Sequence, residues 1–384
     1  MKGESKSGKS WLRQKNFPDS VVVQCRIEFT KVEIFSAIFS ELDINVTLSE
    51  NATVGGTLSF SGKGEIGWQI LAKAEAEAGI EGNYSKEYQK KPIGKDIGDL
   101  RYICEVIKAS KRRIVIEDFH YLPSDTQRSL SHDLKAMWDY GVYLVIIGVW
   151  AHRNYLTYLN PDLAGRIREV SVYWNEKELK DIIYKGCSAL NIDMSQEIVS
   201  QIASDAFGNA GLVQSLTLST LDESQIYDKA EMARTCNKTK HYENAALLYA
   251  EQLEAVFLEF ARRVASGLRR RKASTGIYAY SIWAIFDSSN DELIKGVSVD
   301  TIFERANSRQ PRVQKSNLRL ILPRIDELQI DDRGKGLVVT FSARSDSVVV
   351  VDRSVLFYRK YCTVSWPWEE IAKQSAESEL GGEG

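Results

Sequence analysis

Eight residues near the start of the chain have the types and spacing of a phosphate-binding loop. They read Gly3-Glu4-Ser5-Lys6-Ser7-Gly8-Lys9-Ser10, which fits Gly, four residues, Gly-Lys and then Ser or Thr. In such a loop the backbone N–H groups surround the phosphates, the lysine reaches the β- and γ-phosphates, and the hydroxyl binds Mg²⁺. We therefore predict that Gly3 to Ser10 bind ATP, with Lys9 on the phosphates and Ser10 on the metal.

A pair of acids further along the chain supplies the second half of this chemistry. Ile114-Val115-Ile116 is a β-branched run that leads directly into Glu117-Asp118. A carboxylate at the tip of a buried strand can complete the surroundings of Mg²⁺, and its neighbour can polarise an attacking water. Hydrolysis of a phosphoanhydride is the one reaction that these residues indicate.

Apolar runs alternate with helical patterns through the first part of the chain. Such alternation predicts an α/β fold with a parallel sheet covered on both faces, here a P-loop ATPase core over residues 1–172. The expected strands are 20–25, 114–118 and 142–149, and the expected helices are 11–16, 31–42, 99–110 and 124–140. A Gly-rich segment, residues 50–82, interrupts this order and is interpreted as an insertion of unassigned role.

Only two residues precede the predicted loop, although such a loop normally follows a strand. Without that strand a central position of the sheet would be empty and its neighbours unpaired. We expect that the first strand lies upstream of Met1 and that Met1 is an internal methionine or a late start. The alternative is that another segment fills the position.

The remainder of the chain is predicted to be mostly helical. Residues 173–242 are expected to form a helical lid and a polar connector. Residues 243–362 are expected to form a winged-helix-like domain, because an amphipathic helix precedes three short helices and two strands. Pro323 lies within the third of these helices and would kink it. Residues 363–384 are predicted to be a disordered tail.

Loop, acid-tipped strand, third apolar strand, helical lid and winged helix together resemble the AAA+ ATPases and their STAND relatives. The resemblance implies that Glu117 holds a water of the Mg²⁺ and that Asp118 is the catalytic base. Asp is the shorter carboxylate, so the family pattern with this substitution implies slow hydrolysis.

Three further positions follow from the resemblance. Arg153 or Asn154 lies where the family has its first sensor residue. Arg166, in Ala164-Gly165-Arg166-Ile167-Arg168, lies where an arginine reaches the γ-phosphate of a neighbouring subunit; pairing of Arg166 and Arg168 with Asp162 or Glu169 is the alternative. Gly211, in the segment 208–216, replaces the arginine of the second sensor, which favours a switch over a fast enzyme.

Composition limits the remaining classes. The chain has 384 residues, 43% hydrophobic and 27% charged, with a formal net charge of −2, so any affinity for nucleic acid needs a local patch. The longest apolar runs are too short to cross a bilayer. Five single cysteines and four scattered histidines show no zinc spacing, which indicates reduced thiols, a cytoplasmic location and no metal beyond the Mg²⁺ of the nucleotide.

Two functions from different classes remain at this stage. The first is an ATP-dependent molecular switch that acts on a protein partner or a homo-oligomer, by analogy in bacterial defence or mobile-element biology. The second is a nucleotide-responsive DNA-binding regulator, whose basic residues would be Arg269, Arg270, Arg271, Lys315 and Arg319.

Overall fold

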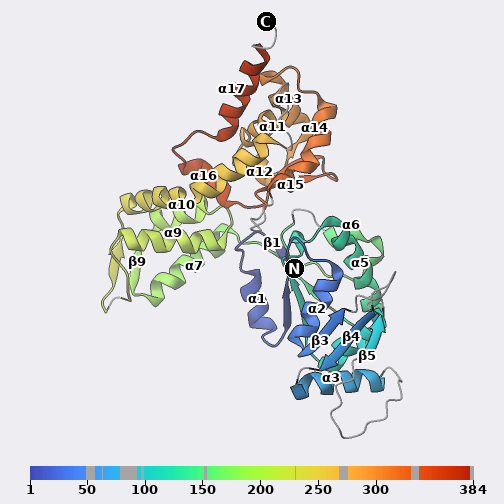
Figure 1. Cartoon of the computed structure of the whole chain (residues 1–384). Coiled ribbons are helices and arrows are strands. Elements are labelled where there is room, and N and C mark those ends of the chain that lie inside the picture. The colour runs from blue at the N-terminus through green and yellow to red at the C-terminus, as the bar shows by residue number, and fades with distance from the viewer. Residues whose placement is uncertain are drawn as a thin grey trace. The chain divides into compact units, whose positions relative to one another are not determined.

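The computed structural model describes residues 1–48, 57–62, 64–77, 93–96, 99–150, 154–229, 231–267, 276–329 and 337–380. Figure 1 shows the chain with its elements labelled. The chain forms two compact units. The first contains residues 1–3 and 9–171, and the second contains residues 4–8 and 172–384. The middle of the predicted phosphate loop therefore belongs to the second unit.

A three-stranded parallel sheet forms the centre of the first unit. Its order is β2 (Val21–Gln24), β6 (Ile114–Glu117), β7 (Val145–Ile146). Helices α1 (Lys9–Asn16), α2 (Lys31–Glu41), α4 (Leu100–Ser110), α5 (Ser124–Asp139) and α6 (Tyr155–Leu159) belong to the same unit. All four side chains of β6 are buried, as expected of a central strand with helices on both faces. The predicted α/β class is confirmed, although β7 is much shorter than the apolar run that predicted it.

Lys2 and the first residue of the predicted loop, Gly3, form a short strand, β1 (Lys2–Gly3). The Met1 carbonyl accepts from the Gly148 N–H at 3.2 Å, and the Lys2 N–H donates to the Val170 carbonyl at 2.8 Å. β1 therefore lies between the end of β7 and the residues that lead into β8 (Ser171–Val172). From the sequence we expect a strand upstream of Met1 in this sheet position, whereas in the structure Lys2–Gly3 occupies it.

The Gly-rich insertion contains regular structure. β3 (Ile44–Leu48), β4 (Thr57–Gly62) and β5 (Ile93–Asp96) form an antiparallel sheet in that order. Helix α3 (Gly64–Glu77) follows β4 and buries Leu71 and Ala74. The predicted insertion, residues 50–82, therefore contributes the central strand of this sheet and a helix.

The second unit begins with four helices and a small parallel strand pair. The helices are α7 (Glu176–Ala189), α8 (Gln196–Asp205), α9 (Ala210–Glu223) and α10 (Thr239–Ser266). Strand β10 (Arg234–Cys236) pairs with β9 (Ile192–Met194). Residues 222–242, which the sequence presented as a polar connector, thus contain a strand.

The following region contains helices and a small sheet, including one short helix and one short strand that the sequence did not predict. It contains α11 (Ile277–Phe286), α12 (Asn290–Lys295), β11 (Val297–Ser298), α13 (Val299–Arg309), α14 (Lys315–Ile321), α15 (Ile325–Gln329), β12 (Val339–Ser342) and β13 (Ser347–Val350). The strands form a sheet in the order β11-β13-β12. Pro323 divides the predicted third helix into α14, a 3₁₀ turn (Leu322–Arg324) and α15.

Two helices follow this region, α16 (Ser354–Tyr361) and α17 (Pro367–Leu380). The sequence had predicted a disordered tail from residue 363. The Trp366 and Trp368 rings stack at 4.3 Å between centroids, and Trp368 is 1% exposed and lies 5.0 Å from the Phe286 ring. These aromatic contacts hold α17 against the core of the second unit. The polar sequence at the end of the chain gave no indication of such contacts. None of the described helices is both long and apolar enough to cross a membrane.

Candidate functional site

The carbonyl groups of the phosphate loop are held by side chains and backbone of the second unit. The Trp174 Nε1–H donates to the Ser7 carbonyl at 2.8 Å, and the Gly211 N–H donates to the Lys6 carbonyl at 3.1 Å. The Asn209 side-chain amide donates to the Ser5 carbonyl at 3.3 Å. Three consecutive carbonyls of the loop thus accept hydrogen bonds from residues 174–211.

This arrangement determines where the loop presents its N–H groups. In a trans peptide the C=O of one residue and the N–H of the next point in opposite directions. With the Ser5 and Ser7 carbonyls directed to their donors, the Lys6 and Gly8 N–H groups point away from them. Lys6 (φ 57°) and Gly8 (φ 88°) have left-handed backbone conformations, which alternate with right-handed ones in anion-binding nests. The Ser7 N–H between these two residues donates to the Glu4 carbonyl at 3.3 Å, so the loop is a tight turn with left-handed residues on both sides of Ser7.

The predicted second-sensor segment, residues 208–211, supports the loop. A Cβ at Gly211 would lie 2.6 Å from the Lys6 Cβ and 3.2 Å from the Lys6 oxygen, so only glycine permits this approach. Asn209 is buried and also caps α9 by accepting from the Leu212 N–H at 3.0 Å. Gly211, noted in the sequence for the arginine that it replaces, is a position of close backbone contact.

An acid inside the loop is paired with an arginine from the start of α16. The Arg353 Nη2 lies 2.6 Å from the Glu4 Oε1, and the Arg353 Nη1 donates to the Phe207 carbonyl at 2.6 Å. Both side chains are mostly buried, at 11% exposed for Glu4 and 20% for Arg353. Sequence reasoning missed Arg353, Trp174 and Asn209 as site residues.

In the first unit, Lys9 begins α1 and its side chain is buried. The ammonium donates to the Gly3 carbonyl at 3.1 Å, so it turns back across the residues of its own loop. Ser10, the predicted Mg²⁺ ligand, is exposed in the first turn of the same helix. Lys9 and Ser10 are thus held at a helix N-terminus, where the helix dipole favours anions.

The two predicted acids lie at the end of β6 and differ in environment. Glu117 is buried, and its Oε1 accepts from the Arg13 Nε at 3.1 Å. Asp118 has a left-handed backbone (φ 58°, ψ 32°), a strained conformation for a residue other than glycine. Burial and the neighbouring Glu117 raise the pKa of Asp118, while Lys9 lowers it. Lys9 and Asp118 are therefore near enough for the charge of one to act on the other.

His120 follows the acids and is held in its neutral form. Its Nδ1 accepts from the Val149 N–H at 3.3 Å. Burial, together with the Lys9 charge, lowers the pKa of His120 to about 4. In the described part of the chain no group of three or more His, Cys, Asp or Glu side chains forms a metal site.

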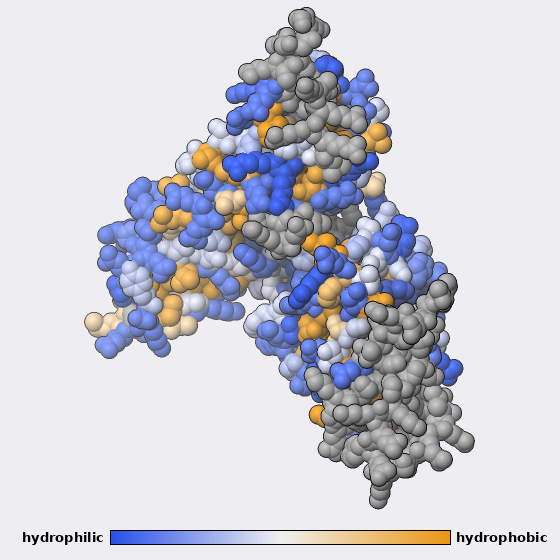
Figure 2. Space-filling model, in the orientation of Figure 1, coloured by the Kyte–Doolittle hydropathy of each residue, from blue (hydrophilic) through white to orange (hydrophobic). Residues whose placement is uncertain are grey.

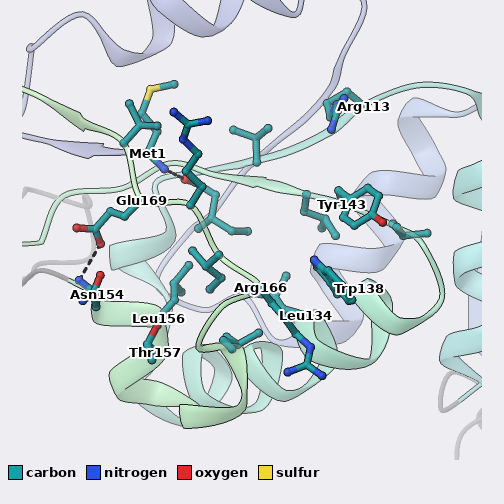
Figure 3. A pocket seen from close by; sticks show the side chains of 18 of the residues that line it. Met1, Arg113, Leu134, Trp138, Tyr143, Asn154, Leu156, Thr157, Arg166 and Glu169 are labelled. Atoms are coloured by element: carbon teal, nitrogen blue, oxygen red, sulfur yellow. Dashed lines mark hydrogen bonds between the residues drawn. The ribbon is translucent and has the colours of Figure 1, made fainter.

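Arg166, predicted to act on a neighbouring subunit, lies on the wall of a pocket of about 510 Å³ (Figure 3). Its Nη1 donates to the Asp162 carbonyl at 2.7 Å and its guanidinium lies 5.5 Å from the centre of the Trp138 ring. The pocket continues from Met1 between residues 142–146 and 166–170, and Figure 3 shows Trp138 and Tyr143 at its rim. Asn154 donates its backbone N–H to Glu169 at 3.0 Å, and Arg153 lies outside the described residues.

The basic residues predicted to contact DNA are only partly described. Arg269, Arg270 and Arg271 lie outside the described residues. Lys315 is paired with Asp300, and Arg319 with Asp346 at 2.6 Å. The face shown in Figure 2 is mostly hydrophilic, with hydrophobic residues scattered over it. Each described cation of the predicted DNA surface therefore has an acidic partner.

Comparison with known proteins gives matches in structure only. No family model and no curated protein matches the chain. The Walker-type ATPase paby2304 of Pyrococcus abyssi aligns with a TM-score of 0.46 at 13% identity, over 93% of this chain and 89% of that chain.

Two further solved structures cover similar shares. Cdc6p from Pyrobaculum aerophilum aligns with a TM-score of 0.33 at 14% identity, over 98% of this chain and 87% of that chain. The Aeropyrum pernix Orc1 protein in complex with DNA aligns with a TM-score of 0.33 at 12% identity, over 94% and 84%. All three TM-scores are below 0.5, so the functional interpretation depends on the residues of this chain.

Proposed function

We propose that the protein binds ATP with Mg²⁺ and hydrolyses it slowly, as a molecular switch of the AAA+/STAND type. The observation that carries this proposal is that helix α1, which begins at Lys9, meets the acidic end of β6, where the Arg13 Nε donates to the Glu117 Oε1 at 3.1 Å. The left-handed backbone of Lys6 and Gly8, of the kind found in anion-binding nests, supports it, because these residues lead directly into Lys9.

Within this proposal each residue has a defined role. The loop N–H groups and Lys9 hold the phosphates, and Asp118 accepts a proton from the attacking water. The Ser10 hydroxyl and a Glu117 carboxylate oxygen are oxygen ligands of the kind that Mg²⁺ prefers, so they suit the metal side. Bound Mg²⁺ would neutralise charge on the phosphates. Arg166 remains the proposed contribution from a neighbouring subunit.

The downstream part of the switch is proposed from the order of its elements. α11 to β13 would be the winged-helix domain, which receives the nucleotide signal and passes it to a protein partner or to another copy of the chain. The DNA-binding regulator is less well supported, because Lys315 and Arg319 are each paired with an acid. A role in bacterial defence or mobile-element biology rests on analogy alone.

Two substitutions test the proposal. Lys9→Ala should abolish ATP binding in calorimetry, because the buried ammonium is lost from the loop. Asp118→Ala should retain binding but reduce turnover by at least about 100-fold, the usual contribution of a general base. Lys15→Ala, on an exposed position of the same helix as Lys9, is the matched control. Tight ATP binding by Lys9→Ala would contradict the proposal.

A further inference from the structure

The Glu4–Arg353 pair places a charge from α16 inside the proposed phosphate loop. Glu4 occupies the first variable position of the loop, where a carboxylate is an unfavourable neighbour for a polyphosphate. Its side chain is mostly buried, so water screens its charge poorly. Something must therefore offset this charge before a triphosphate can bind nearby.

Arg353 supplies that offset with a well-defined geometry. One Nη is 2.6 Å from the Glu4 Oε1 and the other donates to the Phe207 carbonyl at 2.6 Å, so the guanidinium uses both ends. A Cβ at Gly208 would lie 2.6 Å from the Arg353 Nη1, and Gly208 has φ +87°. The glycine therefore makes room for the guanidinium, and a larger residue there would displace it.

We propose that Arg353 is a positioning residue that neutralises Glu4 and thereby couples the position of α16 to the phosphate affinity of the loop. The inference rests on the proposed function and adds a route by which the carboxyl-terminal region affects the site. When α16 is docked, the loop carries a neutral pair and accepts ATP. When α16 moves away, the loop carries an uncompensated acid and ATP binds less tightly. By linkage, bound ATP favours the docked α16 to the same extent.

The proposal makes opposite predictions for the two partners. Arg353→Ala should weaken ATP binding about tenfold, because it leaves the Glu4 charge beside the phosphates. Glu4→Gln should leave ATP binding unchanged or tighten it, because the arginine charge remains. The double variant Glu4→Gln/Arg353→Ala should return to within about threefold of the wild type. Binding of adenosine, which has no phosphate, should not change in any variant.

Calorimetry on the full chain measures the affinity of the wild type and of each variant for ATP and for adenosine. Arg344→Ala, an exposed arginine in the turn between β12 and β13, is the matched control. Arg353→Lys keeps the charge, so it should lose less than Arg353→Ala, and thermal unfolding of each variant reports its folding. Loss of ATP affinity in the double variant equal to that of Arg353→Ala would overturn the inference, since the role would then be structural.

The failure of this inference can be told apart from failure of the proposed function. If the wild type binds ATP and Arg353→Ala binds it equally well, only the coupling is wrong. If the wild type binds no ATP at the loop, and Lys9→Ala changes nothing, both proposals are wrong.

Discussion

At the scale of single residues, the two acids after β6 show how one dipeptide obtains two environments. The Glu117 side chain turns into the protein and meets Arg13, while Asp118 adopts a left-handed backbone and has its pKa raised by burial and by Glu117. A raised pKa makes a carboxylate a better proton acceptor near neutral pH. These two environments suit the roles that we propose, with Glu117 beside the Mg²⁺ and Asp118 as the base.

Arg13 provides a test of the metal side of the site. The Arg13 guanidinium and Mg²⁺ would compete for the same Glu117 carboxylate. Arg13→Ala should therefore lower the Mg²⁺ concentration needed for half-maximal ATP binding, by about three- to tenfold. It should also destabilise the protein in EDTA by about 1–3 kcal/mol, because a buried carboxylate loses its donor.

Mg²⁺ titration of ATP binding and thermal unfolding with EDTA measure both effects. Lys15→Ala, exposed on the same helix α1, should change neither quantity. If Arg13→Ala needs the same Mg²⁺ concentration as the wild type, the proposed role of Glu117 beside the metal is wrong.

The proposed roles of the loop and of the two acids come from residue spacing, because these patterns are local in sequence. The partners of the loop were not predictable in this way. Trp174, Asn209 and Arg353 are far from the loop in sequence, and two of them donate to backbone carbonyls of the loop, which no side-chain pattern reveals. The one available signal was the pair of glycines in residues 208–211.

At the scale of elements, helix α9 is set against the loop by its second residue. Gly211→Ala would normally favour a helix by up to about 1 kcal/mol. Here the new Cβ would meet Lys6 at 2.6 Å, so the loop must move. We expect at least about tenfold weaker ATP binding and a lower unfolding temperature.

Gly186→Ala is the matched control for this change. Gly186 lies in α7, and no heavy atom is within 4 Å of its added Cβ. It should raise stability by up to about 1 kcal/mol and leave ATP affinity unchanged, as calorimetry and thermal unfolding would show. Normal ATP affinity in Gly211→Ala would mean that the loop tolerates the displacement.

The elements predicted from periodicity are those whose buried faces repeat over several turns or a whole strand. α5, α8 and β6 are examples, with apolar residues buried at helical or strand spacing. β10 was missed because it has three residues and only Cys236 is buried. α17 was missed because its anchoring depends on stacked tryptophans at one end and not on a repeated pattern.

At the scale of the whole molecule, one buried carboxylate joins three helices of the second unit. Asp205, at the end of α8, accepts from the Tyr242 hydroxyl of α10 and the Tyr361 hydroxyl of α16, each at 2.6 Å. Lys360 also donates to it at 2.6 Å. Helices α8 and α10 are therefore tied to α16, the helix that begins beside Arg353.

Removing this carboxylate should loosen the second unit. Asp205→Ala leaves two tyrosine hydroxyls and an ammonium without their acceptor, at a cost of about 3–5 kcal/mol in the free energy of unfolding. Asp205→Asn keeps a side-chain oxygen and should cost less. Hydrogen exchange should show reduced protection in α10 and α16 but unchanged protection in β6.

Asp228→Ala, an exposed carboxylate of the same unit, is the control and should have little effect. Full protection of α16 in Asp205→Ala would show that the α16 contacts with α10 are sufficient without the carboxylate.

The assignment of residues 4–8 to the second unit has a practical consequence for dissecting the protein. The polypeptide passes from one unit to the other at residues 3/4, 8/9 and 171/172, so a single cut cannot separate them. A fragment ending at residue 171 would carry the whole predicted phosphate loop and both acids while lacking the tryptophan, asparagine and arginine that contact the loop. Ligand affinities measured on such a truncated piece would describe an unsupported turn and not the intact site.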